Sequence, residues 1–212
     1  MLKIKGQPNM KFVAVHHSGG VGSDPYYSTQ SQVADDINNW HRQRWPEFQS
    51  ELGFWGGYNA FISREGVLTQ FRLIGEETAA NIGHNFDTIS ICLAGNFTIN
   101  PRTGKAVDMP TDEQITKLKE VLSWICFEQK LVPYTSIVPH RGLWNTECYG
   151  NALADTWARD LVKPQREDQL KQLDGLEKSV ISILDQIRAL RNSLSLKGMF
   201  GGMKGTDGHG RG

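Results

Sequence analysis

The order of apolar and polar positions predicts alternating strands and helices over the first three quarters of the chain. Residues 11–16, KFVAVH, form a short apolar run typical of a buried strand. The spacing of Val33, Ile37, Trp40 and His41 then predicts an amphipathic helix with Ser31 as its N-cap. Pro46 should end this helix, because proline cannot continue it.

Further strands and helices follow in the middle of the chain. Residues 58–63 and 67–72 read as a hairpin with Gly66 in its turn, and residues 88–94 read as a buried strand. Residues 98–110 should form a surface excursion. Thr111 and Gln114 have capping-box spacing at the start of a second helix, which should end near Lys130. Residues 134–140 should form another strand that delivers His140, and residues 151–162 a closing helix. This order predicts an α/β domain with a single central mixed β-sheet flanked by helices.

A different pattern begins near residue 165. Aliphatic residues recur there at alternating spacings of three and four, as in the a and d positions of a coiled coil: Leu173, Leu176, Val180, Ile183, Ile187, Leu190 and Leu194. We expect three regions: a domain over residues 1–163, a heptad helix over 164–197, and a flexible tail over 198–212, where seven of fifteen residues are glycine. The helix should form a homo-oligomeric coil; the alternative is docking on its own domain or on a partner protein.

Composition narrows the functional classes. The formal net charge is zero, which gives no support for binding nucleic acid. The N-terminus lacks the apolar run of a signal peptide and no segment is apolar enough to insert into a membrane, so we expect synthesis and retention in a cytoplasm. The three cysteines do not suggest a disulfide framework, and Cys92 and Cys126 lie in apolar runs typical of core positions.

The chemistry of the chain is concentrated in residues 138–150, VPHRGLWNTECYG. His140 and Cys148 are good ligands for zinc, and seven residues separate them, enough for a loop that folds back. A site needs a third ligand, for which His16 at the end of the first strand is the candidate. The competing interpretation is that these residues are structural. His140 and Cys148 would then be ordinary loop residues, and His16 and His17 would be a hydrogen-bonded pair at a strand end.

Other polar groups could line a cleft beside these residues. Tyr58 follows two glycines at the start of its strand, where its phenol could donate a hydrogen bond; a half-buried structural tyrosine is the alternative. His84 lies in a polar loop that could border a groove. His41 is expected to be packed or on the surface rather than in contact with substrate.

These fragments together resemble the N-acetylmuramoyl-L-alanine amidases of the phage-lysozyme and peptidoglycan-recognition-protein type. The resemblance covers roughly residues 8–162 and rests on FVAVHHSGG, NWHRQRW, GYNAFISREGVLTQFR, GHNFDTISICLAGNF and HRGLWNTEC, in this order and spacing. It implies one Zn²⁺ held by His16, His140 and Cys148. The family's catalytic tyrosine falls on Tyr58, and its lysine or threonine two residues before the cysteine falls on Thr146.

The resemblance also implies a substrate and further contacts. The substrate is bacterial peptidoglycan, cut between N-acetylmuramic acid and the first L-alanine of the stem peptide, and His17, His84 and Asn59 are predicted to contact it. Many members continue Cys-Pro-Gly where this chain has Cys148-Tyr149-Gly150, which affects the loop and not the ligand set.

The residues support this activity chemically. With three protein ligands, zinc keeps one position for a water and lowers the pKa of that water towards ~7. Tyr58 and Thr146 would supply hydrogen-bond donors for the oxyanion. The chain lacks the H-E-x-x-H motif of many metalloproteases, and Glu147 is only a weak candidate for proton transfer.

Three classes of function therefore compete. The first is a zinc amidase, either a phage endolysin that stays in the host cytoplasm until lysis or a virion-associated lysin. The second is a non-catalytic peptidoglycan-binding module, which is disfavoured because all three candidate ligands are present. The third is a structural protein of a virion that assembles through its heptads.

Overall fold

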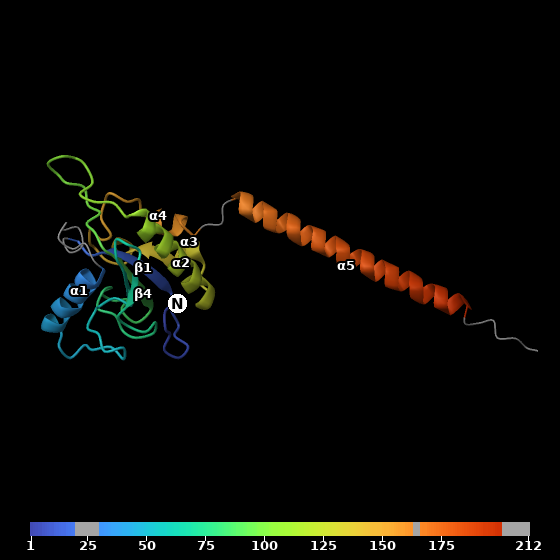
Figure 1. Cartoon of the computed structure of the whole chain (residues 1–212), viewed down its shortest axis with the longest axis horizontal. Coiled ribbons are helices and arrows are strands. Elements are labelled where there is room, and N and C mark those ends of the chain that lie inside the picture. The colour runs from blue at the N-terminus through green and yellow to red at the C-terminus, as the bar shows by residue number, and fades with distance from the viewer. Residues whose placement is uncertain (20–29, 163–165, 201–212) are drawn as a thin grey trace, which may run out of the picture. The chain divides into compact units, whose positions relative to one another are not determined.

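The computed structural model describes residues 1–19, 30–162 and 166–200, and it divides the chain into two compact units, Met1–Lys163 and Pro164–Gly212. The first unit contains one five-stranded sheet in the order β3-β2-β4-β1-β5, of which Figure 1 labels β1 and β4. The strands are β1 Phe12–His17, β2 Ala60–Ile62, β3 Leu68–Gln70, β4 Thr88–Leu93 and β5 Ile137–Pro139. Strand β3 is antiparallel to β2, and the other neighbours are parallel. The predicted single mixed sheet is confirmed.

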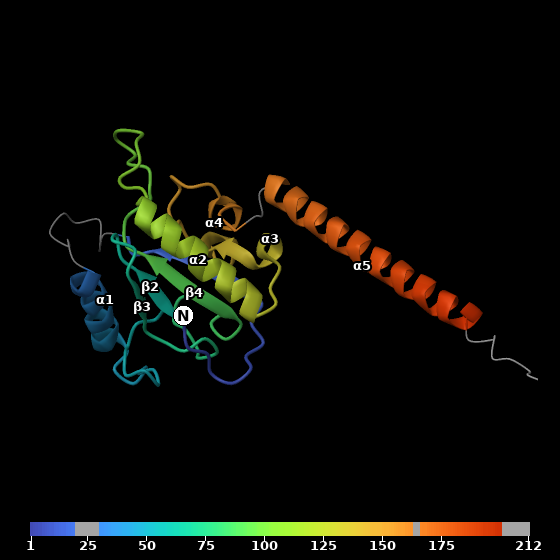
Figure 2. The same cartoon turned by 45° about the vertical axis from the view of Figure 1, so that its right-hand side comes forward.

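Helices cover both faces of this sheet. Helix α2, Asp112–Glu128, crosses one face (Figure 2), where Leu118, Leu122 and Ile125 pack on the inward side chains of β1, β2 and β4. Helix α1, Gln30–Arg44, packs Ala34 and Ile37 on the opposite face, against Phe61 and Cys92. Because successive strand residues point to opposite faces, the odd-numbered residues of β1 join the α2 core and the even-numbered ones face α1.

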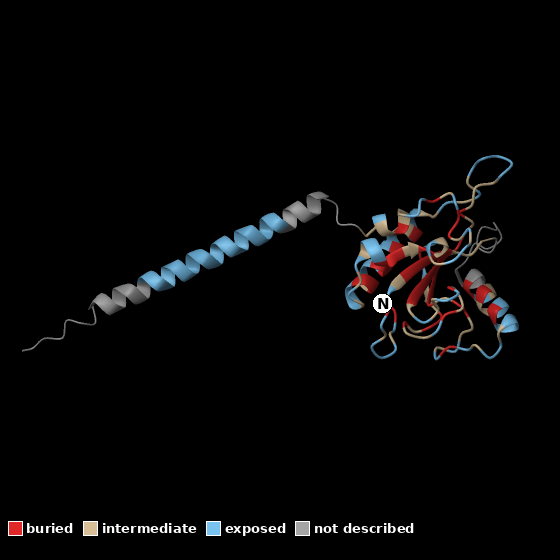
Figure 3. Cartoon of the chain, turned by 180° about the vertical axis from the view of Figure 1, so that it is seen from behind, coloured by how far each residue is buried: buried red, intermediate tan, exposed pale blue. Residues whose placement is uncertain are grey.

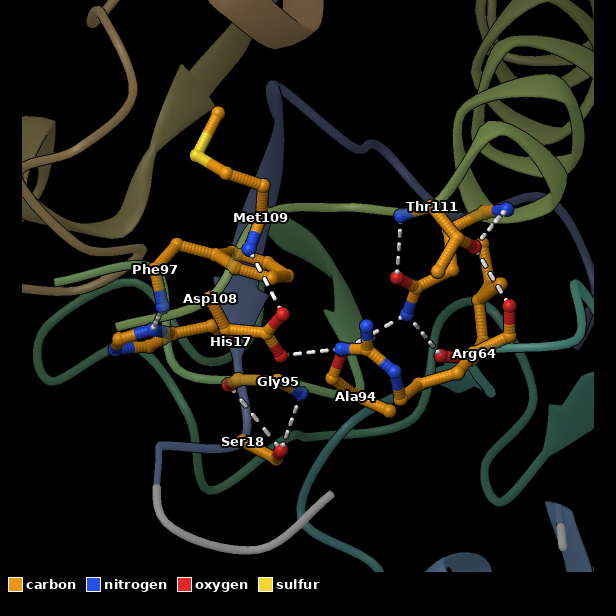
Figure 4. A network of polar contacts seen from close by, with 11 residues as sticks. His17, Ser18, Arg64, Ala94, Gly95, Phe97, Asp108, Met109 and Thr111 are labelled. Carbon is orange, nitrogen blue, oxygen red and sulfur yellow. Dashed lines mark hydrogen bonds and ion pairs between the residues drawn. The ribbon is translucent and has the colours of Figure 1, made fainter. Parts of the chain in front are cut away.

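The predicted capping box fixes the start of α2. The Thr111 hydroxyl accepts from the Gln114 N–H, and the Gln114 side chain accepts from the Thr111 N–H. Thr111 also donates to the carbonyl of Arg64 in the hairpin turn, and Arg64 pairs with Asp108 (Figure 4). The buried Gln114 amide donates to the carbonyl of Ala94 at 2.9 Å, which ties the helix to the end of β4.

Some predicted boundaries were wrong. Helix α1 begins at Gln30, so Ser31 lies inside it and is not its cap. Trp40, predicted to face the core, is 55% exposed. The closing helix predicted over residues 151–162 is only one turn, α4 Trp157–Asp160, because a run of turns precedes it. Another one-turn helix, α3 Pro133–Ser136, occupies the first part of the strand predicted over residues 134–140.

The described part of the second unit is a single long helix, α5 Arg166–Phe200, which ends three residues beyond the helix end predicted at residue 197. Its apolar side chains over residues 173–192 are exposed (Figure 3), with Leu173, Val180 and Leu190 each more than half accessible. The rest of the tail, residues 201–212, lies outside the described residues. No helix in the described part of the chain has both the length and the hydrophobicity needed to cross a bilayer.

Candidate metal centre and active-site groove

Two neighbouring parallel strands bring the three predicted ligands together. His16 lies near the end of β1, and His140 follows directly after β5 as the first residue of the 3₁₀ turn η1, His140–Gly142. Cys148 lies in the loop that follows this turn. One ligand atom from each of the three side chains lies within 4.8 Å of the others, and the Cys148 Sγ atom is 3.7 Å from His16 Nδ1.

This arrangement fits a zinc ion. Ligands at 2.0–2.3 Å around a tetrahedral zinc lie roughly 3.3–3.8 Å from one another, close to the spacing of Cys148 and His16. The Nε2 atoms of His16 and His140 are both buried without a hydrogen-bond partner among the described residues. Buried polar atoms are seldom left unpaired, so these imidazoles are held for an interaction that protein groups do not satisfy.

The electrostatic surroundings keep both imidazoles neutral, as metal ligands must be. Burial lowers the pKa of His16 well below 6.5, and the neighbouring His140 and His17 lower it further. Burial likewise lowers the pKa of His140. Burial raises the pKa of the Cys148 thiol to about 11, although a hydrogen bond from the His17 backbone and the charge of Arg141 act in the opposite direction.

The pleat of β1 directs the adjacent side chains of His16 and His17 to opposite faces of the sheet. His16 points to the α1 face, towards Cys148, whereas His17 points to the α2 face, where its ring lies 5.8 Å from that of Phe97. His17 Nδ1 accepts a hydrogen bond from the Phe97 N–H at 3.1 Å (Figure 4). The backbone N–H of His17 donates to the Cys148 sulfur at 3.4 Å, so this residue supports the site through its main chain.

Arg141 holds the loop that carries Cys148. Its backbone N–H donates to the Cys148 carbonyl at 2.8 Å, and its guanidinium donates to the carbonyls of Gly150 and Leu153 and pairs with Asp155. Gly150 has a φ of 97° and packs so closely on the chain after β4 that a Cβ atom there would lie 2.1 Å from the Phe97 carbonyl oxygen. No other residue type fits this position without moving the loop.

A groove of about 460 Å³ opens beside the three ligands. Tyr58 and Thr146 both line it, and the Tyr58 ring lies 5.2 Å from the His16 ring. Burial, together with the nearby thiols of Cys92 and Cys148, raises the pKa of Tyr58 well above 10, so its hydroxyl keeps its proton and can donate. Thr146 accepts from the Cys148 N–H at 3.3 Å, which leaves its own hydroxyl proton for another acceptor.

Residues of α1 and the chain just after it form the far wall of the groove. The Arg44 guanidinium lies over the rings of Trp40 and Trp45, and the Trp45 ring stacks on His41. His41 is buried, which agrees with the expectation that it is packed, and it also lines the groove. Its Nδ1 accepts from the Gly57 N–H at 3.1 Å, and burial beside Arg44 and Arg72 lowers its pKa to about 4. The sequence signal for this burial was the helical spacing of residue 41, which placed it on the inward face of the predicted helix.

Two predicted substrate contacts lie elsewhere. Asn59 is fully buried, accepts from the Ser90 N–H and donates to the Leu73 carbonyl, so its amide is occupied in joining β4 to the hairpin. His84 pairs with Asp87 at 3.2 Å and packs edge-on against Phe12, and it is not among the described residues that line the groove. Of the three predicted contacts, only His17 borders the groove.

Solved structures with the same fold include bacterial amidases and an animal recognition protein. The amidase LysC from Clostridium intestinale URNW has a TM-score of 0.55 at 19% identity, covering 75% of this chain and 94% of its own. The endolysin amidase LysCS from the same organism has a TM-score of 0.50 at 19% identity, covering 71% and 87%. Human PGRP-IβC, solved with a glycosamyl muramyl pentapeptide, has a TM-score of 0.53 at 16% identity, covering 72% and 82%.

Sequence comparison defines the family. No curated protein matches the chain. A family model described as N-acetylmuramoyl-L-alanine amidase matches residues 6–151, a stretch that includes β1, β5 and the three clustered ligands. The chain therefore belongs to the N-acetylmuramoyl-L-alanine amidase family.

Proposed function

We propose that this protein is a zinc-dependent peptidoglycan hydrolase that cleaves the amide between N-acetylmuramic acid and the L-alanine of the stem peptide. The observation that carries the proposal is the convergence of His16, His140 and Cys148 at the floor of a groove that Tyr58 and Thr146 also line. Two imidazoles and one thiolate form a ligand set that suits zinc and leaves a fourth position for water, as catalytic zinc sites do.

The chain's own groups have separate tasks in this reaction. Bound zinc would polarise the scissile carbonyl and lower the pKa of a water molecule at neutral pH. Tyr58, which keeps its proton, donates to the oxygen on which negative charge develops, and Thr146 donates to it from the Cys148 loop. Addition of water across the amide yields a lactyl carboxylate and a stem peptide with a free L-alanine amine.

The far wall of the groove suits a glycopeptide. Trp40 and Trp45 offer aromatic surface, and Arg44 offers a cation that can pair with a carboxylate. The bound muramyl peptide named for human PGRP-IβC supports peptidoglycan as the ligand of this fold. A non-catalytic binding role is the alternative, and the intact three-ligand cluster favours hydrolysis over it.

We further infer a lysin that acts at the cell wall of a bacterial host, as the endolysin name of LysCS supports. A phage endolysin that stays in the host cytoplasm until lysis and a lysin carried in a virion share this chemistry. The exposed aliphatic seam of α5 supports pairing with a second copy of the chain, because uncovered apolar side chains favour association.

Metal removal and return would test zinc dependence. Purified protein is stripped with a strong chelator, dialysed, and assayed on dye-labelled peptidoglycan with and without one equivalent of Zn²⁺. Activity should vanish on stripping and return with zinc but not with Mg²⁺, which prefers oxygen ligands. Full activity in the stripped protein would refute the proposal.

A further inference from the structure

The described side chains of α5 form an exposed apolar stripe that is wider than its seam (Figure 3). Leu176, Val180, Ile183 and Ile187 belong to the seam with alternating spacings of three and four, and each is 46–64% exposed. Leu184, which is 46% exposed as well, directly follows Ile183 and lies along one flank of this seam. Apolar side chains of this size favour association when water surrounds them.

The flank that carries Leu184 also carries two opposite charges. Glu177, Leu184 and Arg191 are spaced by seven residues, so all three lie on the same side of the seam, in the e positions of the heptad. Both charged side chains are exposed. Neither makes an ion pair within the described part of the helix, where Arg188 pairs with Asp185. The charge along this flank therefore changes sign at Leu184.

The opposite flank is neutral over the described side chains. Its g positions there are Ser179 and Gln186, an alcohol and an amide. In a parallel pair of helices, the e flank of one copy faces the g flank of the other. Arg191 would then face Gln186 of the second copy, and Leu184 would lie against its Ser179. A parallel pair thus leaves the charges without partners and sets an apolar side chain against a hydroxyl.

An antiparallel pair brings equivalent flanks together and reverses their order. Glu177 and Arg191 are each seven residues from Leu184, on opposite sides of it. Reversal about Leu184 therefore sets Glu177 of each copy against Arg191 of the other, and it sets the two Leu184 side chains against each other. Opposite charges across the edge of a seam are the usual means by which coiled coils fix partner and orientation.

The same register also fits the apolar seam. It sets Val180 of one copy level with Leu190 of the other, and Ile183 level with Ile187 of the other. Each of these layers pairs an a position with a d position, and all four side chains are among the exposed ones. One arrangement of two helices therefore covers the seam, covers Leu184 and pairs the charges of its flank.

We propose that α5 forms an antiparallel two-stranded coiled coil with a second copy of the chain, and that ion pairs between Glu177 and Arg191 fix this orientation. The inference rests on the self-pairing of α5 proposed above and is independent of the zinc centre. It implies that the two chains enter the coil from opposite ends, whereas a parallel coil would receive both at one end.

Charge reversal tests the ion pairs. The dimer dissociation constant of the full-length protein is measured by sedimentation equilibrium. Glu177→Arg and Arg191→Glu should each raise it about ten-fold, because two exposed pairs per dimer change from attraction to repulsion. The double variant restores both pairs and should return to the native value. Lys178→Glu, an exposed charge reversal away from the seam and its flanks, is the matched control. Single variants with native dissociation constants would contradict the proposal.

Cross-linking with a short thiol reagent gives the orientation directly, with the native chain as the control for its own cysteines. Leu184→Cys should link two copies efficiently, because the two positions meet in the antiparallel register. Val180→Cys should not, because its two copies then lie roughly 15 Å apart along the coil. A dimer with the reverse pattern would overturn the antiparallel orientation and leave self-pairing intact. A monomeric or trimeric full-length protein would overturn the two-stranded coil itself. Neither result depends on whether the protein binds zinc or cleaves peptidoglycan.

Discussion

The sulfur of Cys148 lies 3.7 Å from Nδ1 of His16, although the two residues are 132 positions apart. At the end of β1, the backbone N–H of His17 also donates a hydrogen bond to this sulfur, at 3.4 Å. The thiol is therefore fixed by the sheet and by its own loop together. Cys148 lines the same groove as Tyr58 and Thr146, which makes it the most informative site for substitution.

Replacing Cys148 with serine should remove most of the bound metal and the activity. A serine hydroxyl keeps its proton at neutral pH and is a poor zinc ligand compared with a thiolate. Metal content by plasma mass spectrometry measures the effect. Cys126→Ser, on the buried face of α2, is the matched control and should keep its zinc. Stoichiometric zinc with full activity in Cys148→Ser would rule out the assigned ligand.

Tyr58→Phe should lower the rate by about 100-fold or more while zinc stays bound. The substitution keeps the ring and removes only the hydroxyl that would stabilise the transition state, a loss comparable to that of an oxyanion-hole donor. Initial rates on labelled peptidoglycan, with metal content in parallel, provide the measurement. Tyr134→Phe removes an exposed hydroxyl from α3 and serves as the control. An unchanged rate would return Tyr58 to a structural role.

Thr146→Ala should act in the same direction but more mildly, by about ten-fold, the worth of one neutral hydrogen bond. The same substitution removes the acceptor for the Cys148 N–H, so zinc content must be measured beside the rate. Thr146→Ser restores the hydroxyl and should restore the rate. A rate equal to the native one in Thr146→Ala would exclude the donor role.

Acid should destabilise the fold partly through His41. Its pKa is about 4 in the folded chain and near 6.5 when unfolded, so the unfolded chain binds more protons between these values. The contribution of the neutral His41 imidazole to the free energy of unfolding is fully present above pH 6.5. It decreases as the pH drops towards 4, by at most about 3 kcal/mol. Denaturant unfolding at several pH values, compared with His41→Asn, isolates the effect. Asparagine can still accept from the Gly57 N–H but does not titrate. If the free energy of unfolding depends on pH equally in the two proteins, the contribution assigned to His41 is refuted.

Truncation should separate the two units of the chain. We expect the full-length protein to be an oligomer through the seam that begins at Leu173, and a chain that ends near Val162 to be monomeric and still active. Light scattering gives the masses. A monomeric full-length protein would contradict the coil, and an insoluble truncation would indicate instead that α5 covers its own domain.

Local patterns were enough to predict much of the fold. The apolar run in residues 11–16, the glycine turn at Gly66 and the capping box of Thr111 and Gln114 each depend on near neighbours, and each appears in the structure. The candidate ligands could be named because His16 lies near the end of a strand, and His140 and Cys148 lie in the segment that follows another. The parallel pairing of β1 and β5 brings these strand ends together.

Features that depend on distant partners could not be predicted in this way. Asn59 is adjacent to Tyr58, yet its side chain is fully buried, and the Ser90 N–H and the Leu73 carbonyl occupy its amide. The region before Trp157 is made of turns, since Tyr149 and Arg141 use its carbonyls as acceptors.

The products released from purified peptidoglycan test the central claim most directly. Digests by the zinc-loaded protein, by the metal-stripped protein and by Cys148→Ser are compared by mass spectrometry. The zinc-loaded protein should release stem peptides with a free L-alanine amino terminus and leave intact glycan strands, and the other two should release almost none. Binding without release, cleavage within the glycan or the peptide, or equal release by all three proteins would contradict a zinc amidase built on His16, His140 and Cys148.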